Sequence, residues 1–281
     1  MTPQGPADPR PPVTSRRHPD IVRIRKYARR PALTQPAGCF LLDGIHLFEE
    51  ALAASCAAET VLWSPRLERQ AAGRVLLARM RGAGWPLRAV TDDLLDTLAL
   101  TRSPQGVVGL FRRRPGPHPL PRPLPAAPMG TAALVLAGLQ DPVNVGVLGR
   151  AARAFGCPLL IALDDTVDPF HPRALRASSG LLLHLEVATA ISEAQLRAWI
   201  DDQKLRAAAL VPRGGEPLAV AATTAGGVVL VLGSEGRGLA PTLEAACTQR
   251  WCIPMAAGID SLGVAAAGTI ALYALAQDRV G

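Results

Sequence analysis

A run of proline residues divides the sequence into two parts. Residues 115–128, PGPHPLPRPLPAAP, place a proline at nearly every second position. Proline fixes its own backbone angle and lacks an amide hydrogen, so this run is expected to form a semi-rigid, extended spacer and neither a helix nor a central strand. We therefore predict two folded domains, over residues 16–114 and 130–281, joined by a linker at 115–129. The Pro-rich and polar residues 1–15 are expected to be disordered.

The first part of the chain alternates between apolar strands and helices. Strands are expected at CFLLDG (39–44), AETVLWS (58–64), PLRAVT (86–91) and GVVGLFRR (106–113), and helices over residues 45–55, 66–81 and 92–100. This order predicts a small α/β domain. Ahead of it, residues 16–30 hold seven Arg and Lys residues against one acid, Asp20. That pattern is typical of a solvated helix face or of a helix that contacts RNA.

The second part alternates in the same way, but most of its strands are continuous apolar runs. Strands are expected over residues 133–139, 158–163, 184–188, 205–211, 226–233 and 249–255, and helices over 144–156, 172–182, 192–203 and 261–277. Ser192 is the expected N-cap of the third helix. Strands without polar alternation are buried on both faces, which is typical of a parallel sheet covered by helices.

Three strand ends in this part lead into unusual loops, and ligands of such sheets bind at strand carboxyl ends. The segments are LVLAGLQDPVNVGVLGRAARAFG (134–156), LVLGSEGRGLAP (230–241) and WCIPMAAGIDSLGVAAAGTIAL (251–272). Each alone has a structural interpretation: an ordinary strand–turn–helix, a tight glycine turn, or Ser261 as a helix N-cap. Because the glycines fit no hydrolase elbow, dinucleotide fingerprint or P-loop, a Rossmann-type oxidoreductase is the weaker alternative.

Together the three segments resemble the SpoU/TrmH family of RNA ribose methyltransferases. The resemblance lies in N-x-G-x-x-x-R from Asn144 to Arg150, in LGSEGRGL at 232–239, and in IPM followed by SLxV before a small-residue helix. FLLDGIHLFEEAL is similar to the start of the RNA-binding domain that precedes the catalytic domain in many members, and that domain resembles a ribosomal RNA-binding protein. The resemblance covers residues 18–280.

The family implies an α/β fold whose C-terminal parallel-sheet domain (SPOUT) carries a deep trefoil knot, one of the rare exceptions to unknotted topology. It also implies S-adenosylmethionine as methyl donor, a homodimer, and methylation of a ribose 2′-hydroxyl. Carried over position by position, it implies a catalytic set of Asn144, Arg150, Glu235 and Ser261, and a cofactor pocket with Leu232, Gly233, Ile253, Met255 and Leu262. Arg150 keeps its proton at any workable pH, so we expect it to hold a phosphate and stabilise the developing alkoxide rather than act as a base.

One position departs from the family pattern. The third motif usually reads SLN, whereas this chain has Ser261-Leu262-Gly263. Two alternatives follow. The enzyme works with a backbone or water substitute for the missing amide, or the chain is a catalytically impaired paralogue that has kept RNA binding.

The formal net charge of +7 predicts an acidic partner, although Arg-rich and Ala-rich chains are often basic without binding anything. The residues expected to contact RNA are Arg25, Lys26, Arg112, Arg113, Arg153 and Arg176. Large-subunit ribosomal RNA is the first expected substrate and tRNA the second, because the small N-terminal domain resembles those on ribosomal-RNA enzymes more than the helical extensions of tRNA enzymes.

The remaining composition argues against several other classes. The five cysteines are scattered without a CxxC pair, so neither a metal site nor a disulfide framework is expected. No apolar run reaches the length of a membrane span, and no signal-peptide segment follows the start. We expect a cytoplasmic protein with reduced, mostly buried thiols.

Overall fold

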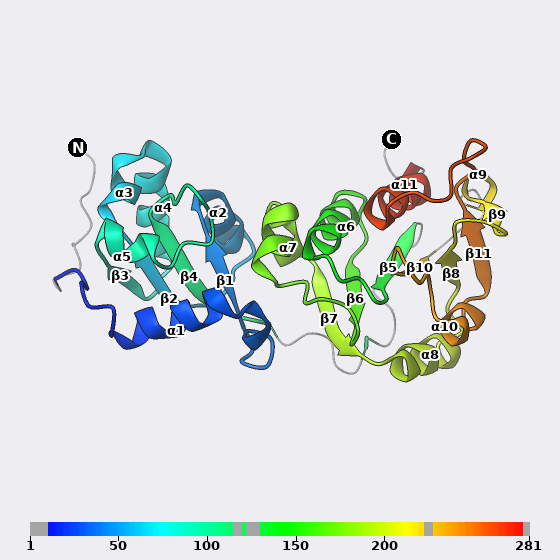
Figure 1. Cartoon of the computed structure of the whole chain (residues 1–281), viewed down its shortest axis with the longest axis horizontal. Coiled ribbons are helices and arrows are strands. Elements are labelled where there is room, and N and C mark those ends of the chain that lie inside the picture. The colour runs from blue at the N-terminus through cyan, green and yellow to red at the C-terminus, as the bar shows by residue number, and fades with distance from the viewer. Residues whose placement is uncertain (1–10, 115–119, 122–129, 222–226, 278–281) are drawn as a thin grey trace. The chain divides into compact units, whose positions relative to one another are not determined.

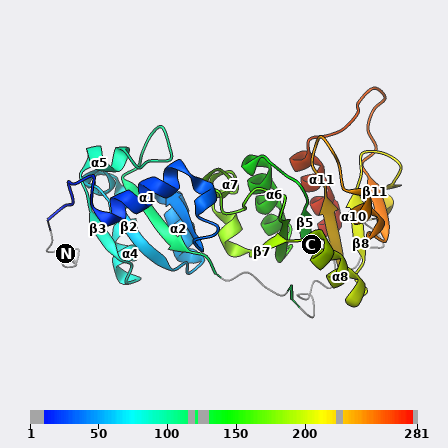
Figure 2. The same cartoon turned by 60° about the horizontal axis from the view of Figure 1, so that its bottom comes forward.

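The structure, a computed structural model, describes residues 11–114, 120–121, 130–221 and 227–277. The chain divides into two compact units (Figure 1, Figure 2). The first extends to Arg114 and includes Phe170–Leu183, and the second holds the rest of the described chain. Residues 1–10 of the predicted disordered tail, and residues 115–119 and 122–129 of the predicted linker, lie outside the described residues.

The first unit is built on a four-stranded sheet of order β1-β4-β2-β3, with antiparallel β1–β4 and β4–β2 pairs and a parallel β2–β3 pair. Its elements are α1 (Pro19–Arg29), a 3-10 turn (Pro31–Leu33), β1 (Cys39–Asp43), α2 (Ile45–Ala53), β2 (Ala58–Trp63), α3 (Pro65–Arg69), α4 (Ala71–Gly82), β3 (Leu87–Ala89), α5 (Asp92–Asp96), β4 (Val107–Arg112) and α7 (Pro172–Ala177). The four strands predicted between residues 39 and 113 are therefore confirmed.

Apolar side chains bury both faces of this sheet. On one face, Ile21 and Ile24 of α1 pack in a cluster with Leu41 and Leu110, which leaves the basic side of the helix toward solvent. On the other face, the ring of Phe111 lies 5.3 Å from that of Phe48, in an edge-on contact. The helix α1 is thus amphipathic, with an apolar side that belongs to the core.

One predicted helix of this unit was wrong in detail, and one residue of the predicted tail is hydrogen-bonded to the sheet. The helix expected over 66–81 is divided at Gln70, whose backbone is extended. The chain on either side of Gln70 packs closely, since a Cβ at Gly73 would lie 2.0 Å from the carbonyl oxygen of Leu67. Within the predicted disordered tail, the amide of Val13 donates to the carbonyl of Ala89 at 2.9 Å, so this residue is tied to the end of β3.

The second unit holds a seven-stranded sheet of order β7-β6-β5-β10-β8-β11-β9 in which each pairing is parallel. Its elements are β5 (Thr131–Leu136), α6 (Pro142–Ala154), β6 (Leu159–Leu163), β7 (Glu186–Ile191), α8 (Glu193–Asp202), β8 (Ala207–Leu210), β9 (Glu216–Pro217), α9 (Leu218–Ala221), β10 (Val228–Leu232), α10 (Pro241–Ala245), β11 (Gln249–Cys252) and α11 (Val264–Ala276). A 3-10 turn (Leu181–His184) has its first three residues in the first unit and His184 in the second. The sequence did not predict β9, α9 and α10.

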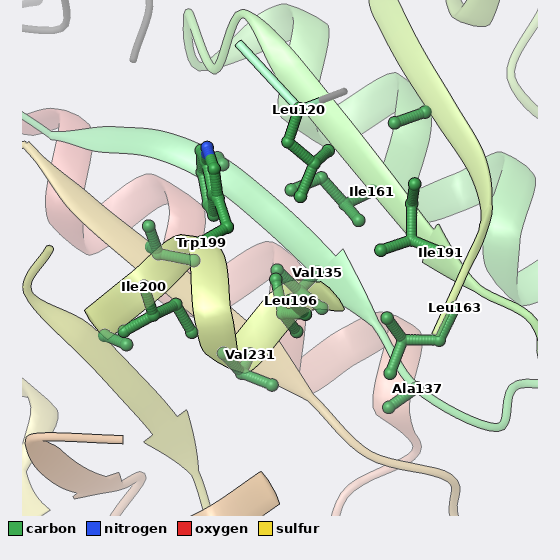
Figure 3. Close-up of a cluster of buried hydrophobic side chains, with 14 of the residues drawn as sticks. Leu120, Val135, Ala137, Ile161, Leu163, Ile191, Leu196, Trp199, Ile200 and Val231 are labelled. Atoms are coloured by element: carbon green, nitrogen blue, oxygen red, sulfur yellow. The ribbon is translucent and has the colours of Figure 1, made fainter. Parts of the chain in front are cut away.

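Helices cover both faces of this sheet. Leu196, Trp199 and Ile200 of α8 pack on one face against Val135 and Val231 of β5 and β10 (Figure 3). Ser192 caps α8 as predicted, with a reciprocal hydrogen bond from Gln195. The predicted linker contributes to the same core, since Leu120 is buried there and the indole N–H of Trp199 donates to the carbonyl of Pro121 at 2.9 Å.

On the other face α6 and α11 lie side by side (Figure 1). A Cβ at Gly268 of α11 would meet Leu148 of α6 at 2.4 Å and Leu232 of β10 at 2.6 Å, so glycine permits this close approach. The parallel α/β unit and the smaller α/β unit before it confirm the predicted fold class. The trefoil knot stays a prediction.

Candidate functional site

The three loops singled out in the sequence meet at one edge of the seven-stranded sheet. They follow β5, β10 and β11, which lie close together in the parallel sheet around β8. The carboxyl ends of parallel strands share an edge, and this is where such folds bind ligands. Segments far apart in the sequence are therefore brought together.

A single carboxylate joins the three segments. Oε1 of Glu235, in the loop after β10, accepts a hydrogen bond from Nδ2 of Asn144 at 3.2 Å. The same oxygen accepts the backbone N–H of Val264, the first residue of α11, at 3.1 Å. Glu235 thus links the first turn of α6 to the start of α11.

A cavity of about 430 Å³ opens beside this junction. Its walls include the five predicted cofactor residues together with Glu235 and Ser261: Leu232, Gly233, Glu235, Ile253, Met255, Ser261 and Leu262. They also include Leu210, Val211 and Pro212 at the end of β8, which sequence reasoning missed. The missing signal is strand order, because β8 lies between β10 and β11 in the sheet but not in the chain.

The glycine-rich loop 233–238 folds back on itself. Ser234 and Gly238 exchange two backbone hydrogen bonds, of 3.2 and 2.9 Å. A Cβ at Gly233 would lie 2.3 Å from the carbonyl carbon of Gly238, so only glycine fits there. The tight turn considered from the sequence is therefore present, and it forms one wall of the cavity.

A second cavity, of about 1030 Å³, shares the loop 234–238 with the first. Its wall is more polar and includes Gln140, Asp141, Asn144, Asp164 and Asp165. The side chain of Asp141 accepts the amide of Val143 at 3.0 Å and caps α6, which begins at Pro142 and therefore two residues earlier than predicted.

The other two predicted catalytic residues, Ser261 and Arg150, differ in their relation to the junction. Ser261 lines the smaller cavity but does not cap α11, because that helix begins at Val264 with Gly263 as its N-cap. Arg150 is exposed on α6, and neither cavity includes it in its wall. Among the described residues, the junction therefore brings Asn144, Glu235 and Ser261 together without Arg150.

The basic residues expected to contact RNA differ in how free their side chains are. Lys26, Arg153 and Arg176 are exposed, and the side chain of Arg112 is 73% exposed although its Nε lies 3.4 Å from Oε1 of Glu59. Arg25 is half-buried, with Nη1 donating to the carbonyl of Arg16 at 3.3 Å.

Arg113 is held inside the first unit. Its Nε donates to the carbonyl of Cys39 at 2.8 Å, and its guanidinium lies 4.8 Å from the ring centre of Phe170. Both contacts are made with residues of the same unit. Its predicted role in RNA binding is thus the least supported of the six.

The described residues offer little evidence for a reactive cysteine, a metal site or a membrane-spanning helix. Burial raises the pKa of the Cys247 thiol to about 12, so this cysteine stays protonated and is no nucleophile. In the described ranges no cluster of His, Cys, Asp or Glu is arranged to hold a metal ion. None of the helices described is both long and apolar enough to cross a membrane.

Comparisons with known proteins agree with this geometry. Residues 131–273 match the SpoU rRNA Methylase family, and residues 19–109 match the MRM3-like substrate binding domain. An uncharacterized tRNA/rRNA methyltransferase of Synechocystis sp. is 33% identical over 271 residues, which cover 93% of this chain and 92% of that protein.

Two further relatives are more informative about chemistry. The 23S rRNA (guanosine(2553)-2′-O)-methyltransferase of Bacillus subtilis is 24% identical, over 84% of this chain and 88% of its own. The crystal structure of an AdoMet-bound rRNA methyltransferase from Sinorhizobium meliloti matches with a TM-score of 0.80 and 26% identity, over 96% of this chain and 99% of that one. The resemblance seen in the three loops is thereby confirmed: the chain belongs to the SpoU rRNA methylase family and is an RNA methyltransferase.

Proposed function

We propose that this RNA methyltransferase transfers a methyl group from S-adenosylmethionine to a ribose 2′-hydroxyl of large-subunit ribosomal RNA. The observation that carries the proposal is the Glu235 junction, which joins three distant segments beside a cavity walled by the five predicted cofactor residues. The activity named for the Bacillus subtilis relative and the cofactor named for the Sinorhizobium meliloti relative support it.

The smaller cavity suits S-adenosylmethionine. Leu232, Ile253, Met255 and Leu262 offer apolar contact area for the adenosine portion, and the backbone around Gly233 offers polar groups for the adenine edge. S-adenosylmethionine supplies an electrophilic methyl group, while the protein supplies binding and orientation. Because positive charge on the sulfonium disperses during transfer, a wall of aliphatic and backbone groups is favourable.

We assign Arg150 to the RNA. Its planar, permanently charged guanidinium matches a phosphate and can stabilise negative charge that develops on the ribose oxygen. Since Arg150 lies outside the walls of both cavities of its own chain, we propose that it serves the cavity of a partner subunit in a homodimer.

The α11 surface supports such a dimer. Ile270 is 41% exposed and Tyr273 is 52% exposed, and the ring of Tyr273 packs edge-on against Phe155 near the end of α6. Large apolar side chains that are exposed close together on one helix are typical of an association surface. Light scattering should therefore give the mass of two chains, and Tyr273→Lys should lower it toward one.

Mixing two inactive variants tests the shared site. Arg150→Ala is expected to lower transfer by about 100- to 1000-fold with S-adenosylmethionine affinity retained, whereas Arg153→Ala on the same helix serves as a control and lowers it far less. Leu262→Glu places a charge in the cavity wall and should prevent cofactor binding. Mixed dimers of Arg150→Ala and Leu262→Glu should recover activity, because one intact cavity then faces one intact arginine. If the mixture stays inactive, Arg150 does not act across the dimer.

Gly263 does not favour the catalytically impaired alternative. The amide of Val264 donates to Glu235 beside the position where the family usually has an asparagine, so the backbone supplies a polar contact there. A Cβ at Gly263 would lie 3.3 Å from Oε1 of Glu235. We therefore propose an active enzyme.

Mapping ribose methylation tests the substrate. In RNA from a deletion strain, one position of the large-subunit ribosomal RNA should lose its resistance to alkaline cleavage, and the wild-type gene should restore it. A change confined to tRNA would favour the second expected substrate. Loss of a base methyl group, with ribose methylation unchanged, would contradict the proposed chemistry.

A further inference from the structure

The first unit contains a cavity that methyl transfer does not use. It has a volume of about 460 Å³, within the usual range of ligand pockets. It lies where β1 ends and α2 begins, and its wall includes Asp43, Gly44, His46, Thr101, Gln105 and Arg176. All of these residues belong to the first unit.

Asp43 is the unusual group in this cavity. Its side chain is buried, with only 3% of the residue exposed. Oδ2 accepts the backbone N–H of Leu100 at 2.6 Å and the hydroxyl of Thr101 at 3.4 Å. Oδ1 is buried and has no hydrogen-bond partner among the residues that the structure describes. An unpaired carboxylate oxygen in such a place is costly, so a donor from outside the chain that reached it through the neighbouring cavity would be favourable.

Neighbouring contacts fix the shape of this wall. The side-chain oxygen of Gln105 accepts the amide of Ile45 at 2.7 Å, and Gly44 has a φ of +103°. A Cβ at Gly44 would lie 2.9 Å from that Gln105 oxygen. Glycine therefore lets the chain turn closely at the end of β1 and present Asp43 to the cavity.

The rim of the cavity is polar and basic. Arg176 is exposed, and its Nη1 donates to the carbonyl of Leu100 at 3.3 Å, which keeps the guanidinium beside the loop that holds Asp43. His46 and Ser103 are exposed on the same wall. A buried acceptor below a basic rim suits a polar base attached to a phosphate backbone.

We propose that this cavity receives one unpaired guanine of the RNA substrate, whose N1–H and N2–H groups donate to Asp43. This inference rests on the proposed action on RNA. A guanine edge carries two adjacent donors, whereas adenine and cytosine place an acceptor beside their amino group, and uracil has a single imino donor between two carbonyls. In adenine, cytosine and uracil an acceptor atom would therefore face the lone pairs of the Asp43 carboxylate. Proteins read RNA sequence mostly on such unpaired bases.

The charge balance of Asp43 agrees with this role. Burial raises the pKa of Asp43, while the Leu100 amide and the charge of Arg176 oppose that rise. Two further donors from a base would favour the ionised form in the same way.

Oligonucleotide binding tests the inference with the full-length protein. The probes are fluorescent 11-mers of uridine whose central residue is guanosine, inosine, adenosine or cytidine, measured by anisotropy at one salt concentration. The guanosine probe should bind about tenfold more tightly than the adenosine and cytidine probes. Inosine lacks the N2 amino group and should fall between them.

Asp43→Asn is the informative variant because its amide keeps the size of the carboxylate and can still accept from Leu100, while it presents N–H groups to the cavity. It should bind all four probes alike. Asp93→Asn, the same change at an exposed carboxylate of α5, should keep the guanosine preference. Circular dichroism confirms that both variants fold.

The outcomes separate this inference from the proposed function. Equal binding of all probes by the wild type, or a guanosine preference that survives Asp43→Asn, overturns the guanine site but leaves methyl transfer standing. The absence of binding to any of the four probes would also overturn the guanine site. Titration of S-adenosylmethionine into the same samples reports independently on the catalytic unit.

Discussion

Two carboxylates, one in each unit, follow strands that end near a cavity, and their environments are opposite. Glu235 is exposed, yet its Oε1 accepts two hydrogen bonds from its own chain, from α6 and from α11. Asp43 is buried, yet one of its oxygens has no partner in the described part of the chain. The exposed group fixes two segments of its own chain, whereas the buried group has one oxygen left for the proposed recognition of a base.

This difference suggests how the two units divide the work. In the second unit, one acid fixes the relative positions of loops that line the proposed cofactor cavity, and groups that orient a reactive cofactor tolerate little displacement. In the first unit, the acid is fixed by a neighbouring loop through Oδ2 and keeps Oδ1 for a ligand. Burial strengthens that remaining interaction, because water competes less.

Glu235→Ala should give the largest effect on activity. Loss of both hydrogen bonds releases α6 from the start of α11, and kcat/KM for methyl transfer is expected to fall by about 100-fold, with RNA affinity unchanged. Transfer of a radioactive methyl group to RNA measures it, and Glu216→Ala, an exposed acid of the same unit, is the control. Activity within a few-fold of the wild type would show that the junction is dispensable.

The same substitution in each unit should have opposite effects on stability. Gly268→Ala introduces a methyl group that would overlap Leu148 and Leu232, and should lower the free energy of unfolding by about 2 kcal/mol. Gly82→Ala, at the end of α4 where a Cβ meets nothing within 4 Å, should be neutral or raise it by roughly 0.5 to 1 kcal/mol. Urea unfolding followed by circular dichroism measures both. Equal effects would mean that α6 and α11 do not pack as closely as described.

The pH dependence of stability should reveal Asp43. Burial raises its pKa in the folded protein above the ordinary value of 3.8. In the window above that value, the folded state holds more protons than the unfolded state, so this group lowers stability as the pH rises. Asp43→Asn should therefore lose less stability than the wild type between pH 4 and pH 7. The wild type and the variant can be compared by urea unfolding at each pH, and parallel curves would contradict the assignment.

Gly263→Asn should have the smallest effect. It restores the residue usual in the family, but Glu235 already accepts the Val264 amide at 3.1 Å. An added hydrogen bond is expected to change transfer by no more than about fivefold. A gain of several hundredfold in the same assay would instead show that this chain is catalytically impaired.

The strands were predictable because their apolar runs are continuous and bounded by turns. Strand order was not predictable, and it is the reason that Leu210, Val211 and Pro212 were missed as part of the proposed cofactor cavity. The N-cap of a helix was predicted correctly where a side chain makes the cap, as at Ser192 of α8. The start of α11 was predicted wrongly, because the helix begins at Val264 with Gly263, and not Ser261, as its N-cap.

The site residues were predicted by resemblance rather than by pattern, since a lone glycine turn or serine carries little information. Their convergence could not be deduced from the sequence, because it depends on long-range sheet pairing.

Charged residues of the first unit show a second limit of the sequence. The charge of Arg113 suggested a contact with RNA, but its contacts with Cys39 and Phe170 lie within the unit. The role of Asp43 was also not visible, since burial of a carboxylate is a property of the fold.

Calorimetric titration of S-adenosylmethionine into the full-length protein tests the central claim, that three distant loops form one cofactor cavity. The wild type should bind one molecule per chain. Leu262→Glu should abolish that binding, while Val75→Glu, on an exposed position of α4, should leave it unchanged. Absence of binding to the wild type, or undiminished binding to Leu262→Glu, would contradict the account.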